Sequence, residues 1–381
     1  MAQIPPITEA PPQISEYKET PIPSEPNQSI SILRFPSAIS TGFPANDIAE
    51  AEIILPRDRV GKIPIVILLH YWGAADLAVE QRFAKDLNRR GIAAAILTLP
   101  FHLRRAPAGK KSGEMAITAE PEEIKRNLTQ AILDVRRLVD WLVANPTFDA
   151  SKVALSGISL GAVVGACSYA VDTRIQSAAL VLGGGDIAHI LFNSSLTVDI
   201  RRQLRRNDIT EEQLRALIAP VDPLSFATPE RGEGLLVIGA RYDEIIPAVD
   251  TQKLITAFGT PKTIWLNTGH YGGALVERKL YQNVAEFLQA RFSGGQFNPP
   301  PTLKALTLRV GIHYNPDYEL SIAVGVDLWR SPRNGEAYVS GLLTTSGPML
   351  FGGREIGAGF AAGIAITSKQ ITFGLFWGVV F

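Results

Sequence analysis

The 381-residue sequence predicts an α/β fold with a mostly parallel, doubly wound sheet, followed by a C-terminal all-β segment. Between residues 62 and 292, apolar runs too short for helices alternate with amphipathic helical patterns, as in parallel sheets covered by helices on both faces. Beyond residue 302, large apolar residues recur at every second position, which indicates consecutive strands. Residues 293–302 are rich in Gly and Pro and are interpreted as a linker between the two patterns.

The composition describes an ordinary globular interior, with 46% hydrophobic and 19% charged residues. Lys+Arg and Asp+Glu balance at 37 each, so the net charge creates no field that would favour nucleic acid or an anionic membrane. A single cysteine, Cys167, excludes an intrachain disulfide, and we expect it to be a small buried side chain. Binding partners therefore have to be argued from local motifs.

Residues 1–28 are rich in Pro and Glu and are expected to form an extended or disordered lead-in. They contain no basic start followed by an apolar core, so we expect neither a signal peptide nor a membrane helix, and a cytoplasmic location. The ordered chain is expected to begin near residue 29. Apolar residues around Ile30 and over residues 48–55 then predict two antiparallel strands at one edge of the sheet.

The alternating pattern begins with residues 63–69, a near-continuous apolar run that predicts a central strand. Residues 76–90 carry apolar side chains at helical spacing, and residues 92–99 predict the next buried strand. Residues 121–145 begin with Pro-Glu-Glu, which suits a helix N-terminus, and continue with one apolar stripe. Further strands are predicted at 175–182, 235–239 and 263–266, and a last helix at 281–292.

The stretch around Ser159 is the most informative motif. A short apolar run ends in Gly157-Ile158-Ser159-Leu160-Gly161 and continues directly into a small-residue helical pattern. This is the strand, sharp turn and helix of a nucleophile elbow, with the serine at its apex. Glycines flank the serine because larger side chains at those positions would collide with the neighbouring strand and helix.

Two further residue types of hydrolytic chemistry each follow a predicted strand. Asp243 comes after the strand at 235–239, and His270 comes after the strand at 263–266. With Ser159, this order resembles the α/β-hydrolase family over roughly residues 30–292, in particular its esterases, dienelactone hydrolases and prolyl oligopeptidases. The resemblance implies a triad of Ser159 as nucleophile, His270 as general base and Asp243 as the acid that orients it. Glu244 and Asp186 remain alternative acids.

The resemblance also implies an oxyanion hole, whose donors stabilise the charge of the tetrahedral intermediate. One donor is expected to be the backbone N–H of Leu160. The other is expected in His70-Tyr71-Trp72-Gly73, which resembles the family's His-Gly-x-Gly turn but has Tyr71 in place of a glycine. We favour Trp72 over Tyr71 as this donor, and we expect His70 to brace the turn.

Two insertions are expected to shape the pocket. Residues 101–119 are long for a simple connection and are either a functional loop or a solvated one. If Arg104 or Arg105 points inward, it would suit an anionic group on the substrate. Residues 187–222 are expected to form a small helical lid, with Thr210 and Gln213 as a capping box. Tyr71, Arg104, Asp186 and Tyr271 are the candidate substrate contacts.

These observations predict a serine hydrolase, most simply a carboxylesterase that acts on a small-molecule ester without a cofactor. Thioesterase, lipase or peptidase activity remains open, as does a weakly active scaffold or membrane-attachment protein that acts through its tail. No metal site is expected, because the five histidines show no pairing at helical spacing and there is no thiolate cluster. No nucleic-acid partner is expected.

Residues 303–381 form the C-terminal β segment, in which one strand face is apolar and the other consists mostly of Gly, Ala, Ser and Thr. Strands are predicted near 306–312, 320–326, 337–344, 356–367 and 371–381. Three interpretations remain open: a β-domain packing its apolar face on itself or on the hydrolase domain, an oligomer interface, and a membrane-associating module. About five strands are expected to be too few for a closed barrel of about eight.

Overall fold

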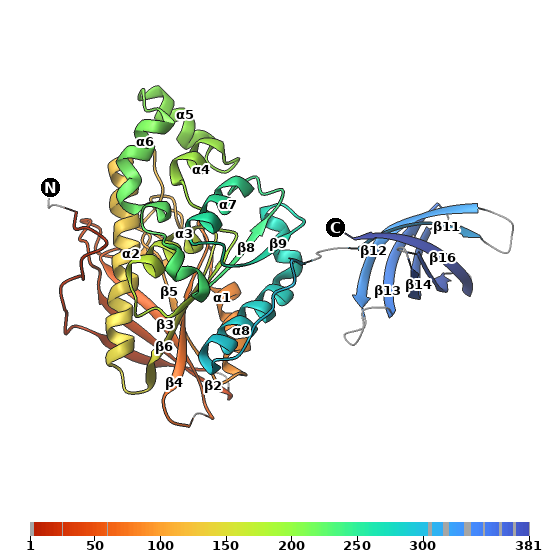
Figure 1. Ribbon diagram of the computed structural model, residues 1–381, viewed down its shortest axis with the longest axis horizontal. Coiled ribbons are helices and arrows are strands. Elements are labelled where there is room, and N and C mark those ends of the chain that lie inside the picture. Colours follow the sequence, from red (N-terminus) through yellow and green to blue (C-terminus); the bar gives the residue numbers. More distant parts are fainter. Residues whose placement is uncertain are drawn as a thin grey trace. The chain divides into compact units, whose positions relative to one another are not determined.

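The computed structural model describes residues 4–24, 26–58, 60–303, 307–314, 320–330, 337–345, 347–357, 360–368 and 371–380. The chain divides into two compact units. The first consists of Met1–Trp265 and Glu277–Pro301, and the second of Leu266–Val276 and Thr302–Phe381. Figure 1 shows a mixed α/β arrangement in the first and an all-β arrangement in the C-terminal part of the second.

The first unit is built on a mixed sheet in which the neighbouring strands follow the order β1-β2-β3-β5-β4-β6-β7-β8-β9. Strands β4 to β8 pair in parallel, as the alternating pattern predicted. The strand bounds are β1 (Lys18–Ile22), β2 (Gln28–Pro36), β3 (Ile48–Pro56), β4 (Ile63–Leu69), β5 (Ala93–Leu97), β6 (Phe148–Ile158), β7 (Ser177–Val181), β8 (Leu235–Ala240) and β9 (Lys262–Leu266).

The N-terminal edge of the sheet is antiparallel, as expected for β2 and β3. The structure adds β1, which pairs with β2 from within the stretch expected to be a disordered lead-in. Ile7 of the same stretch is buried in the main core. The Arg136 guanidinium donates to the carbonyl oxygens of Ile7 and Glu9, so contacts far away in sequence hold this segment.

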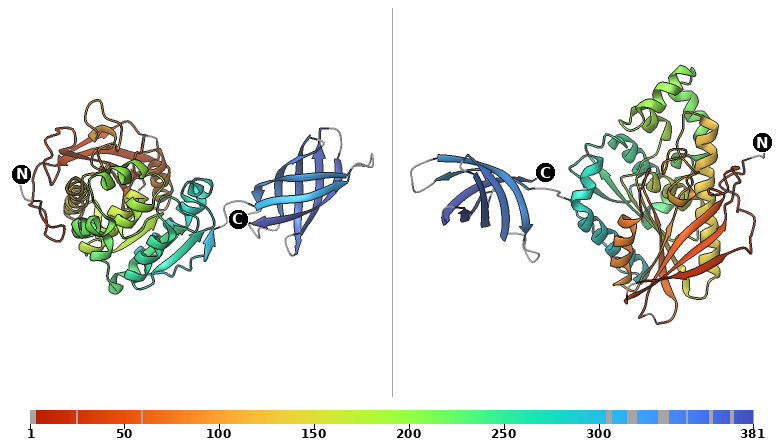
Figure 2. Two further views of the ribbon diagram at one scale, coloured as in Figure 1. Left: turned by 90° about the horizontal axis from the view of Figure 1, so that it is seen from above. Right: turned by 180° about the vertical axis from the view of Figure 1, so that it is seen from behind.

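Helices cover both faces of the sheet (Figures 1 and 2). On one face α1 contacts α8, and on the other α2 contacts α3. The bounds are α1 (Ala78–Asn88), α2 (Pro121–Ala144), α3 (Leu160–Val171), α7 (Ala248–Ala257) and α8 (Glu277–Ser293), with short 3₁₀ turns η1 (Leu103–Arg105), η2 (Ala219–Val221), η3 (Pro223–Ser225), η4 (Pro229–Gly234) and η5 (His270–Val276). This confirms the predicted fold class.

The helix pair α1–α8 joins segments far apart in sequence. Phe83 and Tyr281 stack with ring centroids 4.6 Å apart, and Arg82 makes a bidentate ion pair with Glu277. An aromatic stack of this kind contributes about 0.5–1.5 kcal/mol beyond the area it buries. The exposed ion pair adds less, because water screens it.

The insertion between β7 and β8 contains three helices, α4 (Ile187–Asn193), α5 (Val198–Arg206) and α6 (Glu211–Ile218). The predicted capping box is present: Thr210 Oγ1 accepts from Gln213 N, and Gln213 Oε1 accepts from Thr210 N. The insertion is helical, as predicted, and its role as a lid stays a prediction. These helices form the outermost part of the first unit in Figure 1.

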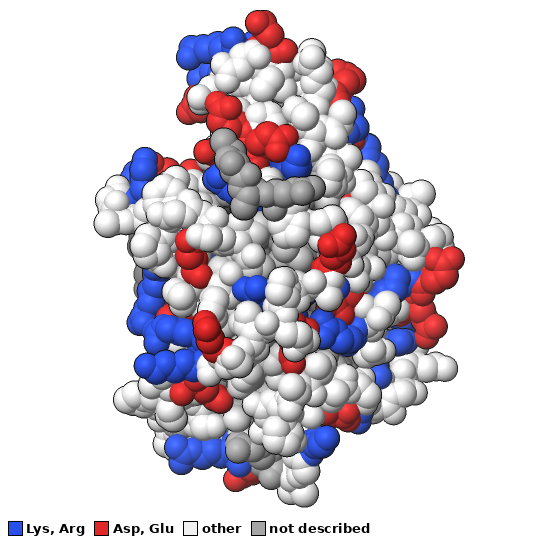
Figure 3. All heavy atoms as spheres, turned by 90° about the vertical axis from the view of Figure 1, so that its left-hand side faces the viewer, with Lys and Arg blue, Asp and Glu red and all other residues white. Residues whose placement is uncertain are grey.

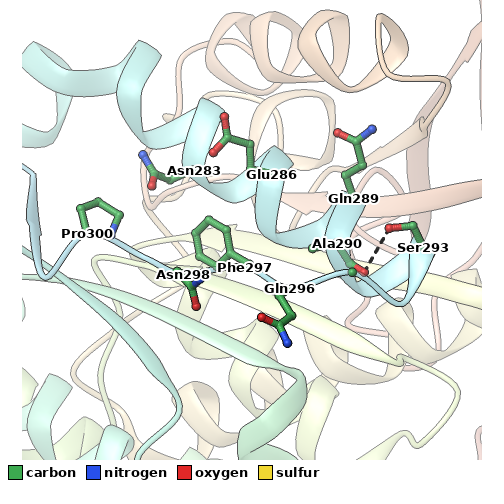
Figure 4. Close-up of a pocket in the computed structure, with 10 residues that line it drawn as sticks. Asn283, Glu286, Gln289, Ala290, Ser293, Gln296, Phe297, Asn298 and Pro300 are labelled. Carbon is green, nitrogen blue, oxygen red and sulfur yellow. Dashed lines mark hydrogen bonds between the residues drawn. The ribbon is translucent and has the colours of Figure 1, made fainter. Parts of the chain in front are cut away.

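After α8 the chain turns at Gly294 and runs back beside the helix, as Figure 4 shows. The ring of Phe297 lies 5.7 Å from that of Phe287 and fixes this returning segment. A groove of about 500 Å³ separates the segment from α8, and its lining includes Asn283, Glu286 and Gln289. Its lining is mostly polar, and it lies outside the site described below.

Positive and negative side chains alternate over the face in Figure 3, without a large area of one sign. This agrees with the balanced composition. Within the described ranges, no helix combines the length and apolarity needed to cross a membrane.

The C-terminal part of the second unit is a closed antiparallel barrel of strands in the order β11-β12-β13-β14-β15-β16 (Figure 2). The expectation that so few strands could not close was therefore wrong. The strand bounds are β10 (Thr302–Leu303), which precedes the barrel, and β11 (Thr307–Tyr314), β12 (Leu320–Arg330), β13 (Ala337–Thr344), β14 (Gly347–Gly357), β15 (Phe360–Thr367) and β16 (Ile371–Val380).

The narrow barrel closes because small residues face inward. A side chain at Gly311 or Gly374 would collide with the ring of Phe376, which is fully buried inside. Phe376 lies against Phe351, with ring centroids 4.4 Å apart. The barrel thus has its own packed core, and the alternating large apolar residues face outward rather than onto one another.

Candidate active site

The carboxyl ends of the parallel strands β4, β6, β7 and β8 meet at one edge of the sheet, where α/β sheets usually hold their ligands. Leu69 of β4 pairs with Gly157 of β6, and Ile158 of β6 pairs with Val181 of β7. The turn after β4, the residue Ser159 after β6 and the loop after β8 therefore converge. These are three of the places at which the sequence predicted functional residues.

Ser159 lies between β6 and α3 with φ 55° and ψ −117°, a conformation that non-glycine residues rarely adopt. Its N–H donates to Val181 O at 2.9 Å, and its carbonyl accepts from Ala162 and Val163, so both sides of the turn are fixed. A side chain at Gly157 would collide with Gly161 O, and one at Gly161 with Leu69 O. The predicted strand, sharp turn and helix around Ser159 are therefore present, and the role of Ser159 as a nucleophile stays a prediction.

A small cavity of about 70 Å³ adjoins Ser159. Its walls are almost entirely apolar and come from the β4 turn, α2, the elbow, the helical insertion and the loop after β8. The lining residues are Trp72, Ile117, Leu128, Ser159, Leu160, Val163, Ile187, Ile190, Leu191, Ser194, Leu196, Thr197, Ile245 and Ile246. Ser159 itself is only 7% exposed, so access to its hydroxyl depends on this cavity.

Asp243 lies in the loop after β8, and its carboxylate is held by that loop. Asp243 Oδ1 accepts the N–H groups of Ile245 at 2.9 Å and Ile246 at 2.8 Å. Both isoleucines line the Ser159 cavity. The N–H of Ser195 in the insertion donates to Glu244 O at 2.9 Å, so a backbone hydrogen bond joins the insertion to the loop after β8.

Asp186, the alternative acid, is the N-cap of α4 and takes part in an ion-pair network. Its carboxylate accepts from Arg215 Nε at 3.0 Å and from Lys253 Nζ at 2.7 Å. Burial alone would raise the pKa of Asp186, but these hydrogen bonds lower it below its usual value. The network joins the insertion to α7, which gives Asp186 a structural role; a contact with substrate stays a prediction.

His270 and Tyr271 lie in η5, within the segment Leu266–Val276 that belongs to the second unit. Their rings meet edge to face with centroids 5.9 Å apart, and Tyr271 is exposed. The pairing of His270 with Ser159 and Asp243 stays a prediction, and so does a substrate contact of Tyr271.

The turn after β4 is braced by His70, as predicted. His70 Nε2 accepts from Leu99 N at 3.0 Å, so the proton is on Nδ1, which donates to Tyr71 O at 2.8 Å. Burial lowers the pKa of His70 to about 3, and the ring is neutral at physiological pH. Trp72 lines the cavity next to Ser159, and its role as the second oxyanion donor stays a prediction.

A second buried histidine, His102, supports the same turn, and the sequence analysis missed this role. His102 Nε2 accepts from Gly73 N at 3.1 Å, and its Nδ1 donates to Pro100 O at 2.8 Å. Trp72 Nε1 donates to Gly113 O at 2.8 Å. The 101–119 loop therefore packs under the β4 turn and fixes Trp72. Gly113 has a φ of 79°, and its close neighbours leave no room for a side chain. No local pattern in the sequence signals the role of His102.

The two arginines of this loop have different surroundings. Arg105 is 1% exposed and pairs with the buried Asp134 at 2.8 Å, while it also donates to the carbonyls of Thr98 and Asn46. It points inward, but into the core. The Arg104 side chain is 75% exposed and lies 3.9 Å from Glu50, so a substrate contact through Arg104 stays a prediction.

The two buried histidines predict a pH dependence of stability. Burial lowers the pKa of His102 to about 4, so the unfolded chain binds more protons than the folded chain below pH 6.5. The contribution of neutral, buried His102 to the unfolding free energy is fully present above pH 6.5 and is lost as the pH falls toward 4. When the pH falls from 7 to 5, the unfolding free energy of the wild type should decrease by about 2 kcal/mol more than that of the His102→Gln variant. Urea titrations at both pH values measure this difference; equal losses would contradict it.

Cys167 is fully buried, as predicted, and burial raises the pKa of its thiol. The thiol donates to Val221 O at 3.2 Å. Over the part of the chain that the structure describes, no group of three or more His, Cys, Asp or Glu side chains could hold a metal ion.

Comparison with known proteins adds independent evidence for the fold. A family model described as "Alpha/beta hydrolase domain containing 18" matches residues 37–181, which include the β4 turn and the elbow. An uncharacterized protein, YdjC of Bacillus subtilis (strain 168), is 25% identical over 105 residues, which are 28% of this chain and 90% of that protein.

Solved structures with a similar fold cover more of the chain. An acetyl xylan esterase from Paenibacillus sp. R4 has a TM-score of 0.55 at 16% identity. This match covers 71% of this chain and 89% of the esterase chain. Acetyl xylan esterase 1 from Thermoanaerobacterium sp. JW/SL YS485 has a TM-score of 0.51 at 16% identity. This match covers 70% of this chain and 87% of the esterase chain. Together with the elbow geometry and the sheet order, these matches show that the first unit has the α/β-hydrolase fold.

Proposed function

We propose that this protein is a serine hydrolase that cleaves carboxylic esters with a short acyl group, through an acyl-enzyme on Ser159. The observation that carries the proposal is the conformation of Ser159, with φ 55° at the head of α3 and beside a small apolar cavity. Backbone strain of this kind costs on the order of 1–3 kcal/mol, and proteins retain it mainly where function requires it.

A serine hydroxyl attacks an ester only when a base removes its proton. In the proposed mechanism His270 takes the proton of Ser159 Oγ as Oγ bonds to the ester carbonyl carbon. The tetrahedral intermediate then collapses, and His270 gives the proton to the departing alcohol. Water, deprotonated by His270, hydrolyses the acyl-enzyme and restores Ser159.

Asp243 would orient the imidazole and stabilise its charged form during both steps. Its position after β8 and the two backbone N–H groups that hold its carboxylate support this role. Asp186 is less suited, because Arg215 and Lys253 occupy its carboxylate. Asp243 is therefore better suited than Asp186 to be the acid of the triad.

The charge that develops on the carbonyl oxygen needs fixed donors. Leu160 N–H is suited because the first N–H groups of a helix have no partner within it, and the positive end of the α3 dipole is there. The second proposed donor is the N–H of Trp72, on the turn that His70, His102 and Gly113 fix. A rigid turn suits this task because donors that need not reorganise stabilise the transition state best.

The size of the cavity determines which acyl groups fit. The cavity beside Ser159 is small, about 70 Å³, and its walls are apolar, which favours a short acyl group. Long acyl chains would require the insertion to move, which the hydrogen bond from Ser195 N to Glu244 O opposes. The walls contributed by Ile187, Ile190 and Leu191 favour an apolar acyl group over a charged one.

A panel of p-nitrophenyl esters with increasing acyl length tests this proposal. We expect kcat/KM to be highest for short acyl groups and to fall as the chain lengthens, because a longer chain has to push apart the apolar walls beside Ser159. The Leu191→Ala variant enlarges the cavity and should shift the optimum to longer chains. Equal rates for all lengths in both proteins, or no hydrolysis of any ester, would contradict the proposal.

A further inference from the structure

The interior of the barrel of β11 to β16 is filled by its own side chains. Its interior already contains a packed core of small and aromatic residues. It also encloses a buried ion pair, in which Arg309 Nε lies 2.9 Å from Asp327 Oδ1, while Ser340 Oγ donates to the same carboxylate oxygen. The Arg309 guanidinium lies 3.8 Å above the Tyr338 ring. Side chains of the barrel itself therefore pack its interior.

The outer face carries large apolar side chains that are exposed on every strand. Examples around the ring are Val310, Ile322, Leu343, Leu350, Ile364 and Phe373, one from each of β11 to β16. Contiguous exposed apolar areas beyond a few hundred Å² are rare on soluble proteins and mark a surface that binds something apolar. Something other than water is therefore expected to cover this face.

The position of these residues around the ring decides between possible partners. In a closed ring of six strands, β12 lies opposite β15 and β13 lies opposite β16. Ile322 and Ile364 therefore point in opposite directions, and so do Leu343 and Phe373. A second copy or another protein covers one patch and leaves the opposite strands exposed. The acyl chains of a lipid bilayer surround a barrel on all sides.

The dimensions and backbone chemistry also fit a bilayer. The barrel strands are 8–11 residues long. A strand of roughly 9–11 residues crosses the hydrocarbon core when tilted. Closure leaves no unpaired strand edge, which is the condition for a sheet in lipid, where no water satisfies free N–H and C=O groups.

The charged and aromatic residues lie where an interface would be. Among the barrel residues whose side chains the structure describes, the exposed charged one is Arg354, which is level with Ala337 at the start of β13. The aromatic pair Phe360 and Trp377 is level with the same end of the barrel. Arginine and aromatic residues at a barrel rim suit the headgroup region.

We propose that the barrel of residues 307–380 inserts into a lipid bilayer and anchors the hydrolase unit there. The inference depends on the barrel alone and holds whether or not Ser159 is a nucleophile. The anchor would keep the hydrolase next to a membrane surface.

The test uses the full chain, purified in detergent and reconstituted into phosphatidylcholine vesicles, with flotation on a density gradient. We expect the wild type to float, also at high salt, because the contact is apolar rather than ionic. Ile364→Arg should lower the ratio of vesicle-bound to free protein by about 30-fold or more. The matched control is Val249→Arg in α7, which should float like the wild type, since Ile364 is 54% and Val249 51% exposed.

A second readout keeps the test valid if Ile364→Arg fails to fold. Phosphatidylcholine brominated along its acyl chains should quench the fluorescence of the wild type, and the Trp377→Phe variant should lose part of that quenching. Wild-type protein that stays in the dense fraction, or that forms a closed oligomer without lipid when detergent is removed, would overturn the proposal. Equal loss of flotation in Ile364→Arg and Val249→Arg would do so as well.

Discussion

Ser159→Ala is expected to lower kcat for short p-nitrophenyl esters by about 10⁴-fold or more, because no other group can form the acyl-enzyme. Binding of the ester should change little, since the apolar cavity and the β4 turn remain in place. Single-turnover and steady-state assays with the purified full chain measure both quantities.

A matched control for this variant is available in the same helix. Ser168 is buried in α3, and its hydroxyl donates to the carbonyl of Val164. Ser168→Ala removes a hydroxyl of the same kind without touching the cavity, so hydrolysis should stay near the wild-type rate. If Ser159→Ala retained the wild-type rate, the nucleophile would have to be another group.

Asp243→Asn is expected to lower kcat by about 10⁴-fold, because an asparagine would hold the wrong tautomer of the catalytic histidine. The replacement keeps Oδ1 as an acceptor for the N–H groups of Ile245 and Ile246, so the loop should survive. Hydrolysis and thermal unfolding of the same preparation separate a catalytic loss from a structural one.

The matched control is Asp186→Asn, at the alternative acid position. This change weakens the ion pairs with Arg215 and Lys253, so it should lower thermal stability while kcat stays close to that of the wild type. The reverse pattern, a deep loss of kcat in Asp186→Asn and a small one in Asp243→Asn, would place the acid after β7 instead.

Much of the first unit could be predicted because its strands are buried on both faces. The run at 63–69 has no polar residue, and its bounds as β4 are those predicted. The Ser159 elbow was predictable for a related reason: the steric conditions at Gly157 and Gly161 leave glycine as the only suitable residue. Local patterns of this kind can be read directly from the sequence.

Features that depend on distant contacts could not be predicted. The Pro-rich N-terminal stretch has the composition of a disordered segment, yet Arg136 holds the backbone of Ile7 from 129 residues away. His102 looked like a loop residue because its partner, Gly73, lies 29 residues earlier. No local period signals such contacts.

The number of strands in the barrel was underestimated because the alternating pattern was incomplete. The strand β14 was missed because Gly352 and Gly353 interrupt its alternation, so only five strands were expected. The same glycine-rich composition makes the interior narrow enough for six strands to close around Phe351 and Phe376. Without the sixth strand, closure of the barrel could not be foreseen.

Mapping of a fluorophosphonate label, which reacts covalently with activated serines, tests directly whether Ser159 is the nucleophile. After incubation of the full chain and proteolysis, peptide mass spectrometry should locate one label on Ser159, and Ser159→Ala should remain unlabelled. A wild-type protein that hydrolyses esters but carries the label on a different residue, or never reacts, would contradict the assignment of Ser159 as the nucleophile.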